Sequence, residues 1–363
     1  MAILAGGAAG EAVTARARAV YEGAVARKRM APEERDARLA RLSRGSDPAV
    51  LMAADLVLDG GGDLNGAVGR KGAVWCMVSG RDGAAARRAQ QGSGVDVLAM
   101  QAYRPAHSLP LVELAVPEGA AADAVMTVVG YFGGPARAVL RSADRPGMIG
   151  HRLMGAVQRA AMALMAAGAD APAIEAAARS LGFARGPLEI IEMDGIGVVV
   201  ARLRRIFGSV PELSLLEARA DAVAAGKTPG QGFFAPQGQA LAPDPGLADW
   251  LRAWRDGKGG GGPDLPDVPL ERALHAAVVA EAARMIADGT VSRASDIDLC
   301  MVRGYGFDKT RGGPLLWADL QGVLGLVRSM KALMPLGEAL WTPLASLEEM
   351  VKFGRRFFGP GVS

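Results

Sequence analysis

A glycine-rich stretch near the start of the chain is the first part of the sequence that could do chemistry. Gly6, Gly7 and Gly10 follow three apolar residues in MAILAGGAAG, residues 1–10. Their spacing is one residue short of the G-x-G-x-x-G turn, whose backbone amides hold the pyrophosphate of a dinucleotide at a helix N-terminus. The stretch is therefore a candidate dinucleotide-binding turn, which the elements around it have to support.

Few other residues could transfer a proton near neutral pH or hold a metal ion. The chain has three histidines, His107, His151 and His275, and two cysteines, Cys76 and Cys300, far apart in apolar surroundings. This distribution predicts two buried, reduced thiols and no disulfide. No cluster has the spacing of metal ligands, so we expect no metal.

Composition bounds the possible classes of function. Half of the 363 residues are hydrophobic, which is enough for two or three packed domains. The 41 basic and 38 acidic residues are mixed along the chain and leave a net charge of only +3, so no nucleic acid or membrane is expected as a partner. The start lacks the basic segment of a signal peptide and no apolar run is long enough for a bilayer, so we expect a cytoplasmic protein.

The periodicity of apolar residues changes along the chain. The first third predicts helices from Glu11 to Arg29 and from Pro32 to Leu42, followed by short buried strands of the parallel type at residues 55–59, 73–78 and 95–100. From Pro146 onward long helices dominate, at residues 151–168, 172–182 and 188–208. A Pro- and Gly-rich linker with one short helix is predicted at 235–268, and further helices at 270–289, 296–307 and 314–334. The fold class is therefore α/β followed by all-α.

Five sequence blocks occur in an order that resembles a known family. They are PAHSLPLVELAV (105–116), RPGMIGHRL (145–153), LGFARGPLEIIEMDG (181–195), GKTPGQGFF (226–234) and SDIDLCMVRGYGFDKTRGGPLLWAD (295–319). Together they resemble the 3-hydroxyacyl-CoA dehydrogenases, in the long form at the C-terminal end of multifunctional fatty-acid β-oxidation enzymes. The resemblance implies a Rossmann-like parallel-sheet domain and two related helical C-terminal domains. The corresponding ranges are 1–145 for a truncated NAD-binding-type domain, 146–234, the linker 235–268, and 269–363.

The candidate glycine turn fits this family poorly. A dinucleotide-binding unit needs a second strand that ends in an acidic residue about 20 residues past the turn. No strand is predicted between Gly10 and Leu56. Alignment to the family places residues 1–7 on its second strand, so Ala5 or Gly6 stands where the ribose-binding acid is expected and the first strand is missing. The competing interpretation makes residues 2–10 the first strand with a divergent loop; in either case, tight binding of the family's cofactor NAD is not expected.

The resemblance also implies positions for catalytic residues. The family oxidises a 3-hydroxyl group by hydride transfer to NAD while a histidine, oriented by a glutamate twelve residues later, removes the hydroxyl proton. Gln101 stands at the position of that histidine and Glu113 at that of the glutamate. His151 replaces the family's asparagine, and the family's serine corresponds to Ser79 or Gly80. A glutamine side chain cannot accept the proton, so only part of the site is retained.

Alternatives remain for the individual residues. Glu113 is either functional or a buried polar remnant that binds backbone amides, and His151 is either a drifted residue or a relocated base paired with Glu113. His107 is expected in a turn and His275 at the surface or boundary of a helix. The glycines of the GYGFDKTRGGP block, residues 304–314, are expected to allow close backbone approach.

Two functions follow from these alternatives. The first is a dehydrogenase by descent that binds acyl-CoA and keeps weak or altered activity. The second is a non-catalytic acyl-CoA binder or assembly partner of other β-oxidation enzymes. In both, the two helical domains are expected to pack on each other within one chain, which leaves a monomer or a homodimer open.

Overall fold

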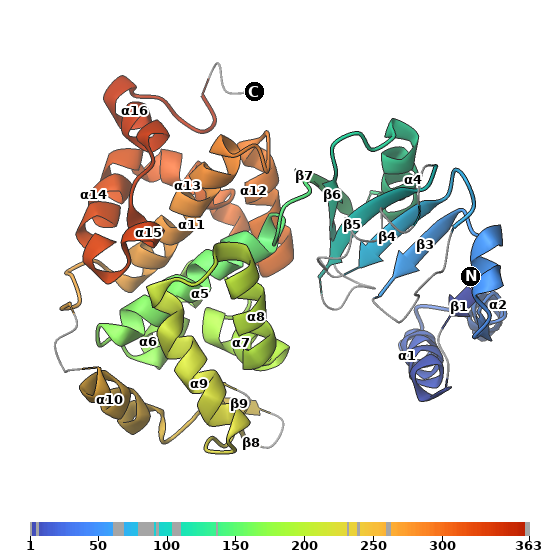
Figure 1. Cartoon of the computed structure of the whole chain (residues 1–363), viewed down its shortest axis with the longest axis horizontal. Helices are drawn as coiled ribbons and strands as arrows, with labels where there is room; N and C mark the ends of the chain where they lie inside the picture. The colour runs from blue at the N-terminus through green and yellow to red at the C-terminus, as the bar shows by residue number, and fades with distance from the viewer. Residues whose placement is uncertain are drawn as a thin grey trace. The chain divides into compact units, whose positions relative to one another are not determined.

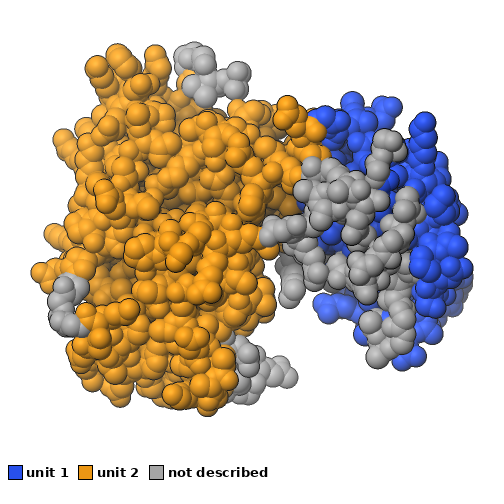
Figure 2. Space-filling model, viewed as in Figure 1, with its two compact units in different colours: residues 1–100, 119–131 blue, residues 101–118, 132–363 orange. Residues whose placement is uncertain are grey.

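The computed structural model of the chain forms two compact units. It describes residues 2–4, 7–60, 69–78, 91, 94–103, 110–135, 137–230, 232–237, 240–258 and 263–359. The first unit contains residues 1–100 and 119–131, and the second contains residues 101–118 and 132–363 (Figure 2).

Parallel strands dominate the first unit. β1 (Ala2–Leu4) and β2 (Ser43–Gly45) pair in a small parallel sheet of their own. Separate from it lie the parallel strands β3 (Leu56–Asp59), β4 (Val74–Val78) and β5 (Asp96–Ala102), which pair in that order. Trp75 and Cys76 in β4 are fully buried, as expected for an apolar strand with neighbours on both sides. The predicted strands at 55–59, 73–78 and 95–100 are confirmed.

The first unit also contains helices. α1 spans Gly7–Ala26, α2 spans Pro32–Leu39, a 3₁₀ turn spans Pro48–Ala53, and α4 spans Ala122–Phe132 (Figure 1). α2 begins at a proline and carries Glu33 and Glu34 in its first turn, where their charges favour the helix N-terminus. Both predicted helices of this region are confirmed, with shorter C-terminal ends.

The expectation that no strand lies between Gly10 and Leu56 is wrong. β2 lies at Ser43–Gly45 and pairs in register with β1, Ile3 opposite Arg44. All three residues of β2 are exposed, so the strand has no apolar alternation by which its sequence could have revealed it.

The second unit begins with two parallel strands and continues as a helical array. β6 (Leu111–Val116) pairs with β7 (Ala138–Ala143). The first helices are α5 (Gly150–Ala166), α6 (Ala171–Ser180), α7 (Pro187–Asp194), α8 (Ile196–Phe207) and α9 (Ser214–Ala224), with a 3₁₀ turn at Pro211–Leu213. The later ones are α11 (Leu270–Ala287), α12 (Ala294–Cys300), α13 (Pro314–Gln321), α14 (Val323–Leu333), α15 (Glu338–Trp341) and α16 (Ala345–Phe353). A π-helical turn at Met301–Tyr305 and 3₁₀ turns at Lys309–Arg311 and Met334–Leu336 join them. The prediction of an α/β part followed by helices is confirmed.

Two helices predicted as continuous are each broken at a glycine. The segment 188–208 forms α7 and α8, which meet at Gly195, and the segment 314–334 forms α13 and α14, which meet at Gly322. Gly195 has φ +85° and Gly322 φ +88°, a conformation that favours glycine over residues with a side chain. Because the apolar spacing continues across both breaks, periodicity alone gives one long helix in each case.

The predicted linker is partly ordered. Its expected short helix is α10 (Leu247–Gly257), whose Leu247 and Leu251 are buried. The antiparallel hairpin of β8 (Phe234–Gln237) and β9 (Ala240–Pro243) was not expected from the composition. None of the described helices combines the length and apolar character needed to cross a bilayer.

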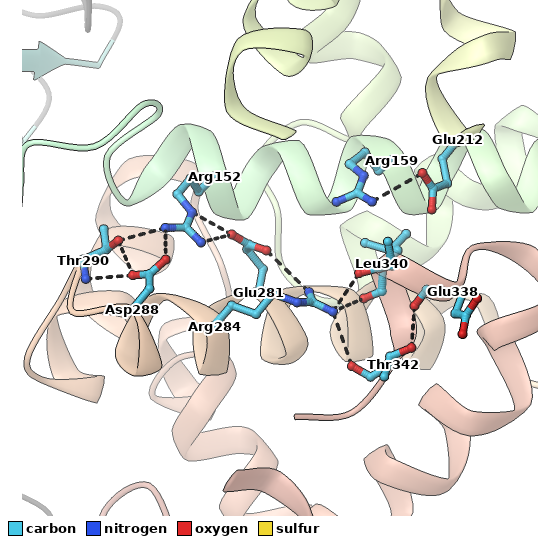
Figure 3. A network of polar contacts seen from close by, with 11 residues as sticks. Arg152, Arg159, Glu212, Glu281, Arg284, Asp288, Thr290, Glu338, Leu340 and Thr342 are labelled. Atoms are coloured by element: carbon cyan, nitrogen blue, oxygen red, sulfur yellow. Dashed lines mark hydrogen bonds and ion pairs between the residues drawn. The ribbon is translucent and has the colours of Figure 1, made fainter. Parts of the chain in front are cut away.

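The two sets of helices pack on each other through α5 and α11, which lie side by side in the second unit (Figure 1). This confirms the expected packing within one chain. Figure 3 shows the polar network along this contact. Arg152 of α5 donates from Nε to Glu281 of α11 at 2.7 Å and from Nη1 to Asp288 and Thr290, both at 2.8 Å. Glu281 also forms an ion pair with Arg284 at 3.5 Å, so its buried carboxylate is compensated by two guanidinium groups.

Candidate functional site

Glu113 lies at the centre of a buried cluster of hydrogen-bonded polar groups in the second unit. The residue belongs to β6 and its side chain is fully buried. Its Oε1 accepts hydrogen bonds from the Tyr103 hydroxyl, from the Cys300 thiol at 3.3 Å and from the Gly150 amide at 3.0 Å. Its Oε2 accepts the Ile149 amide at 2.8 Å. Four donors from three distant segments thus converge on one carboxyl group.

The cluster positions the start of α5. The amides of Ile149 and Gly150 belong to the first turn of this helix, where they have no carbonyl partner within the helix. Glu113 supplies the missing acceptor, in the place where a negative charge is also favoured by the helix dipole. Gly150 is required by space, because a Cβ there would lie 1.8 Å from the Tyr103 hydroxyl oxygen.

Burial raises the pKa of each ionisable group in the cluster. For Glu113, burial raises the pKa, and the hydrogen bonds from Tyr103, Ile149 and Cys300 act in the opposite direction. Burial likewise raises the pKa of Tyr103 and that of Cys300 well above their ordinary values. Tyr305 packs edge-on against Tyr103, with ring centroids 5.3 Å apart, and closes the cluster. A carboxylate with this many donors is stabilised as an acceptor and is poorly placed to orient another side chain.

Gln101, at the position of the family's histidine, binds a neighbouring backbone carbonyl. Gln101 is half-buried at the end of β5, and its Nε2 donates to the Ala102 carbonyl at 3.2 Å. Its buried Oε1 has no hydrogen-bond partner among the described residues. Within the described ranges, no hydrogen bond joins Gln101 to Glu113.

His151 lies next to this cluster without entering it. It is the second residue of α5, directly after the two residues whose amides bind Glu113. Burial, together with the charges of Arg202 and Arg205, lowers the pKa of His151 to about 3. No hydrogen bond to Glu113 occurs among the residues that the structure describes. A histidine with such a low pKa is a weak proton acceptor at neutral pH.

The remaining sequence candidates contribute little to the site. Ser79, the alternative Gly80 and His107 lie outside the described residues. The expectation that His275 is a surface or boundary residue is wrong: it is buried in α11, its Nε2 lies 2.8 Å from the Pro314 carbonyl oxygen, and burial lowers its pKa to about 4. Both thiols are buried and free, as expected. No group of metal-ligating side chains occurs in the described part of the chain.

The described residues near the glycine turn do not fit NAD. In a doubly wound dinucleotide-binding domain, the strand before the phosphate turn lies inside the sheet, between the second and fourth strands. β1 pairs with β2 in a sheet separate from β3, so it does not occupy that position. Asp47, the first acidic residue after β2, accepts the Ala49 amide at 2.9 Å and caps the following 3₁₀ turn.

Comparison with known proteins finds similarity to fatty-acid-oxidation dehydrogenases. Residues 147–235 match the family model described as 3-hydroxyacyl-CoA dehydrogenase, C-terminal domain. This segment of the chain is therefore similar to the C-terminal domain of 3-hydroxyacyl-CoA dehydrogenases. A fatty acid oxidation complex subunit alpha from Pseudomonas syringae pv. syringae is 27% identical over 275 residues, 73% of this chain and 37% of the relative. The glyoxysomal fatty acid beta-oxidation multifunctional protein MFP-a of Cucumis sativus is 24% identical over 71% of this chain and 37% of the relative.

Solved structures share the fold. The 3-hydroxybutyryl-CoA dehydrogenase of Escherichia coli K12 superposes with a TM-score of 0.76 at 18% identity, covering 97% of this chain and 92% of the other. The dehydrogenase part of multifunctional enzyme 1 from C. elegans gives a TM-score of 0.62 at 16% identity, covering 94% and 81%. The chain spans little more than a third of the length of its curated relatives.

Sequence reasoning identified Glu113 and missed the residues that surround it. Tyr103 lies two residues from Gln101, yet no spacing rule singles it out. Cys300 is 187 positions away from Glu113 in sequence. The only signal for Cys300 was its apolar context, which indicated burial and gave no partner.

Proposed function

We propose that this chain is a 3-hydroxyacyl-CoA dehydrogenase-like protein of fatty-acid β-oxidation that binds acyl-CoA and in which NAD-dependent oxidation is impaired. One observation carries the proposal: the Glu113 carboxyl group, which should orient a catalytic base, is bound by Tyr103, Cys300 and the first amides of α5. The named relatives support the substrate class, because they act in fatty-acid oxidation or on 3-hydroxybutyryl-CoA.

The chemistry of the family requires a group that accepts the proton of the 3-hydroxyl. Gln101, at the position of that base, has no titratable nitrogen. His151 is held neutral by burial and neighbouring arginines, and its low pKa makes it a poor substitute. Removal of a general base typically costs about 10² to 10⁴ in rate. The described residues around the glycine turn do not fit NAD, so a second requirement of the reaction is also unmet.

The test compares binding with turnover in the same preparation of the full chain. Isothermal titration with acetoacetyl-CoA measures binding, and the absorbance of NADH at saturating acetoacetyl-CoA measures reduction. The E. coli 3-hydroxybutyryl-CoA dehydrogenase serves as the positive control. We expect saturable acyl-CoA binding together with a rate at least about 10²-fold below the control. Turnover comparable to the control contradicts the impairment, and failure to bind any acyl-CoA contradicts the substrate class.

A role as an assembly partner is the second candidate. The relative from Pseudomonas syringae is a subunit of a complex, and the second unit of this chain keeps a continuous packed core. Co-elution of the full chain with other β-oxidation enzymes on size-exclusion chromatography, unaffected by Gln101→His, supports this role. Elution as a monomer in their presence counts against it.

A further inference from the structure

The second unit contains the same local motif twice. Glu192, near the end of α7, accepts the amides of Phe233 and Phe234 at 3.0 and 3.3 Å. Asp319, at the equivalent position of α13, accepts the amides of Phe357 and Phe358 at 3.0 and 2.9 Å. In both motifs, a carboxyl group near the end of a helix thus accepts the backbone amides of two consecutive phenylalanines.

The two Phe pairs differ in what covers them. Phe233 and Phe234 are both buried, and the chain continues from them into the hairpin of β8 and β9. In the second motif Phe357 is buried, whereas Phe358 is 41% exposed. Phe353, at the end of α16, is 58% exposed, and Leu320, next to Asp319, is 66% exposed. The later motif therefore leaves uncovered apolar surface where the earlier one is covered.

Unpaired cations surround this apolar surface. Lys352, Arg355 and Arg356 are exposed, and none of them has an ion-pair partner within the described ranges. The Lys352 Nζ lies 5.2 Å and the Arg355 Cζ 5.3 Å from the centre of the Phe353 ring. Of the nearby acids on α16, Glu348 is bound to Lys331 at 2.7 Å, which leaves Glu349 as an opposing charge on that helix. We call the set Phe353, Phe358, Lys352, Arg355 and Arg356 the α16 patch.

We propose that the α16 patch docks the protein on an anionic phospholipid surface. Aromatic side chains that enter the headgroup region beside cations that meet lipid phosphates are the combination by which peripheral proteins bind such surfaces. A second copy of the chain fits less well, because a symmetric contact would bring the same three cations together. α16 lies at the periphery of the helical unit beside α14 (Figure 1). The balanced charge of the whole sequence had given no indication of this local excess.

The experiment is co-sedimentation of the full chain with phosphatidylcholine vesicles that contain either half phosphatidylglycerol or none. We expect binding to the anionic vesicles at low salt, at least about tenfold weaker binding to the neutral ones, and loss of binding at high salt. Arg355→Gln with Arg356→Gln should weaken binding by more than about tenfold, since each cation near an anionic surface contributes about fivefold. Phe353→Ser with Phe358→Ser should also weaken it by at least about tenfold.

A matched control uses the exposed apolar residues of the earlier helices. Met193 and Val198 are 48% and 61% exposed, so Met193→Ser with Val198→Ser removes similar surface and should leave binding unchanged. Equal thermal unfolding of all variants excludes misfolding, and the single exchange Phe353→Ser provides a milder variant if the double one unfolds. No binding to anionic vesicles, or equal loss in the control, overturns the proposal. Vesicle binding that is lost with the arginines and unchanged without the phenylalanines also overturns the proposal. Charge alone would then explain the binding, and a purely basic surface is equally able to bind an acidic protein.

Discussion

Replacing Glu113 separates a structural role from a catalytic one. Glu113→Ala removes the acceptor of four donors, the amides of Ile149 and Gly150, the Tyr103 hydroxyl and the Cys300 thiol. A buried donor that loses its acceptor costs about 1–3 kcal/mol, so the two amides alone account for about 2–6 kcal/mol. We expect the free energy of unfolding to fall by about 3 kcal/mol or more, measured by urea unfolding of the full chain followed by circular dichroism.

Glu113→Gln is the matched variant. Its amide oxygen can accept the helix amides while its NH₂ group donates to the Tyr103 oxygen, which can act as an acceptor. We therefore expect a loss of less than about 1.5 kcal/mol. Because the pKa of Glu113 is raised in the folded state, the wild-type carboxyl group stabilises the fold below its ordinary pKa of 4.5, and this contribution is lost as the pH rises through the raised value. The glutamine variant should thus gain stability relative to the wild type as the pH increases from 4.5.

The outcome that refutes the structural role is equally clear. If Glu113→Ala costs less than about 1 kcal/mol, the four hydrogen bonds do not stabilise the start of α5. If Glu113→Gln abolishes a measurable dehydrogenase activity while leaving stability intact, Glu113 acts in catalysis and the impairment proposed above is wrong.

Three further predictions concern other residues. Burial raises the pKa of Glu175 to about 7 and that of Asp298 to about 6. The free energy of unfolding should therefore fall as the pH rises from about 4 to about 7. Glu175→Gln should flatten this dependence, as measured by urea unfolding at several pH values. An unchanged pH profile in this variant contradicts the raised pKa of Glu175. If NAD is held poorly, as proposed above, Gln101→His alone should not raise the rate of acetoacetyl-CoA reduction above background. A gain of about 10²-fold or more would show that the base alone was lacking. Arg152→Ala should lower the free energy of unfolding by about 3–5 kcal/mol, because it leaves the buried Glu281 without its main partner. Arg152→Met with Glu281→Met should lower it clearly less. Equal losses in the two variants contradict the explanation by an uncompensated buried charge.

The parts of the fold that were predictable are those in which burial repeats along the sequence. The apolar run 73–78 specifies a buried strand, and the spacing of alanine, leucine and methionine in 151–168 specifies α5, both of which the structure contains. β2 carries no such pattern, because its residues are exposed and it is held by its pairing with β1. The break at Gly195 is likewise invisible to periodicity, since it depends on one backbone angle.

The candidate site likewise has residues that the sequence predicted and partners that depend on how distant elements pack. The position of Gln101 followed from counting back from Pro105, and Glu113 stands twelve residues further on in the LVELAV segment. Which donors reach Glu113 depends on how β6, α5 and α12 pack, and these elements are separated by up to 187 residues. His275 shows the converse error: a histidine on a helix of mixed composition was expected near the surface, and the packing of α11 buries it against Pro314.

Retention of Glu113 is weak evidence for catalysis, because other acids of the second unit also accept hydrogen bonds from the first amides of a helix. Glu175 accepts the amide of Leu188 at the start of α7 at 2.8 Å. Asp298 accepts the amides of Leu315 and Leu316 at the start of α13 at 2.7 and 3.0 Å. Each of these carboxyl groups, like Glu113, satisfies donors that a helix cannot satisfy itself. A chain that had lost the reaction and kept its fold would still need all of them, whereas nothing in the fold requires a histidine at position 101. Glu113 together with Gln101 is therefore the combination that the proposed impairment predicts, because folding alone would keep the acid.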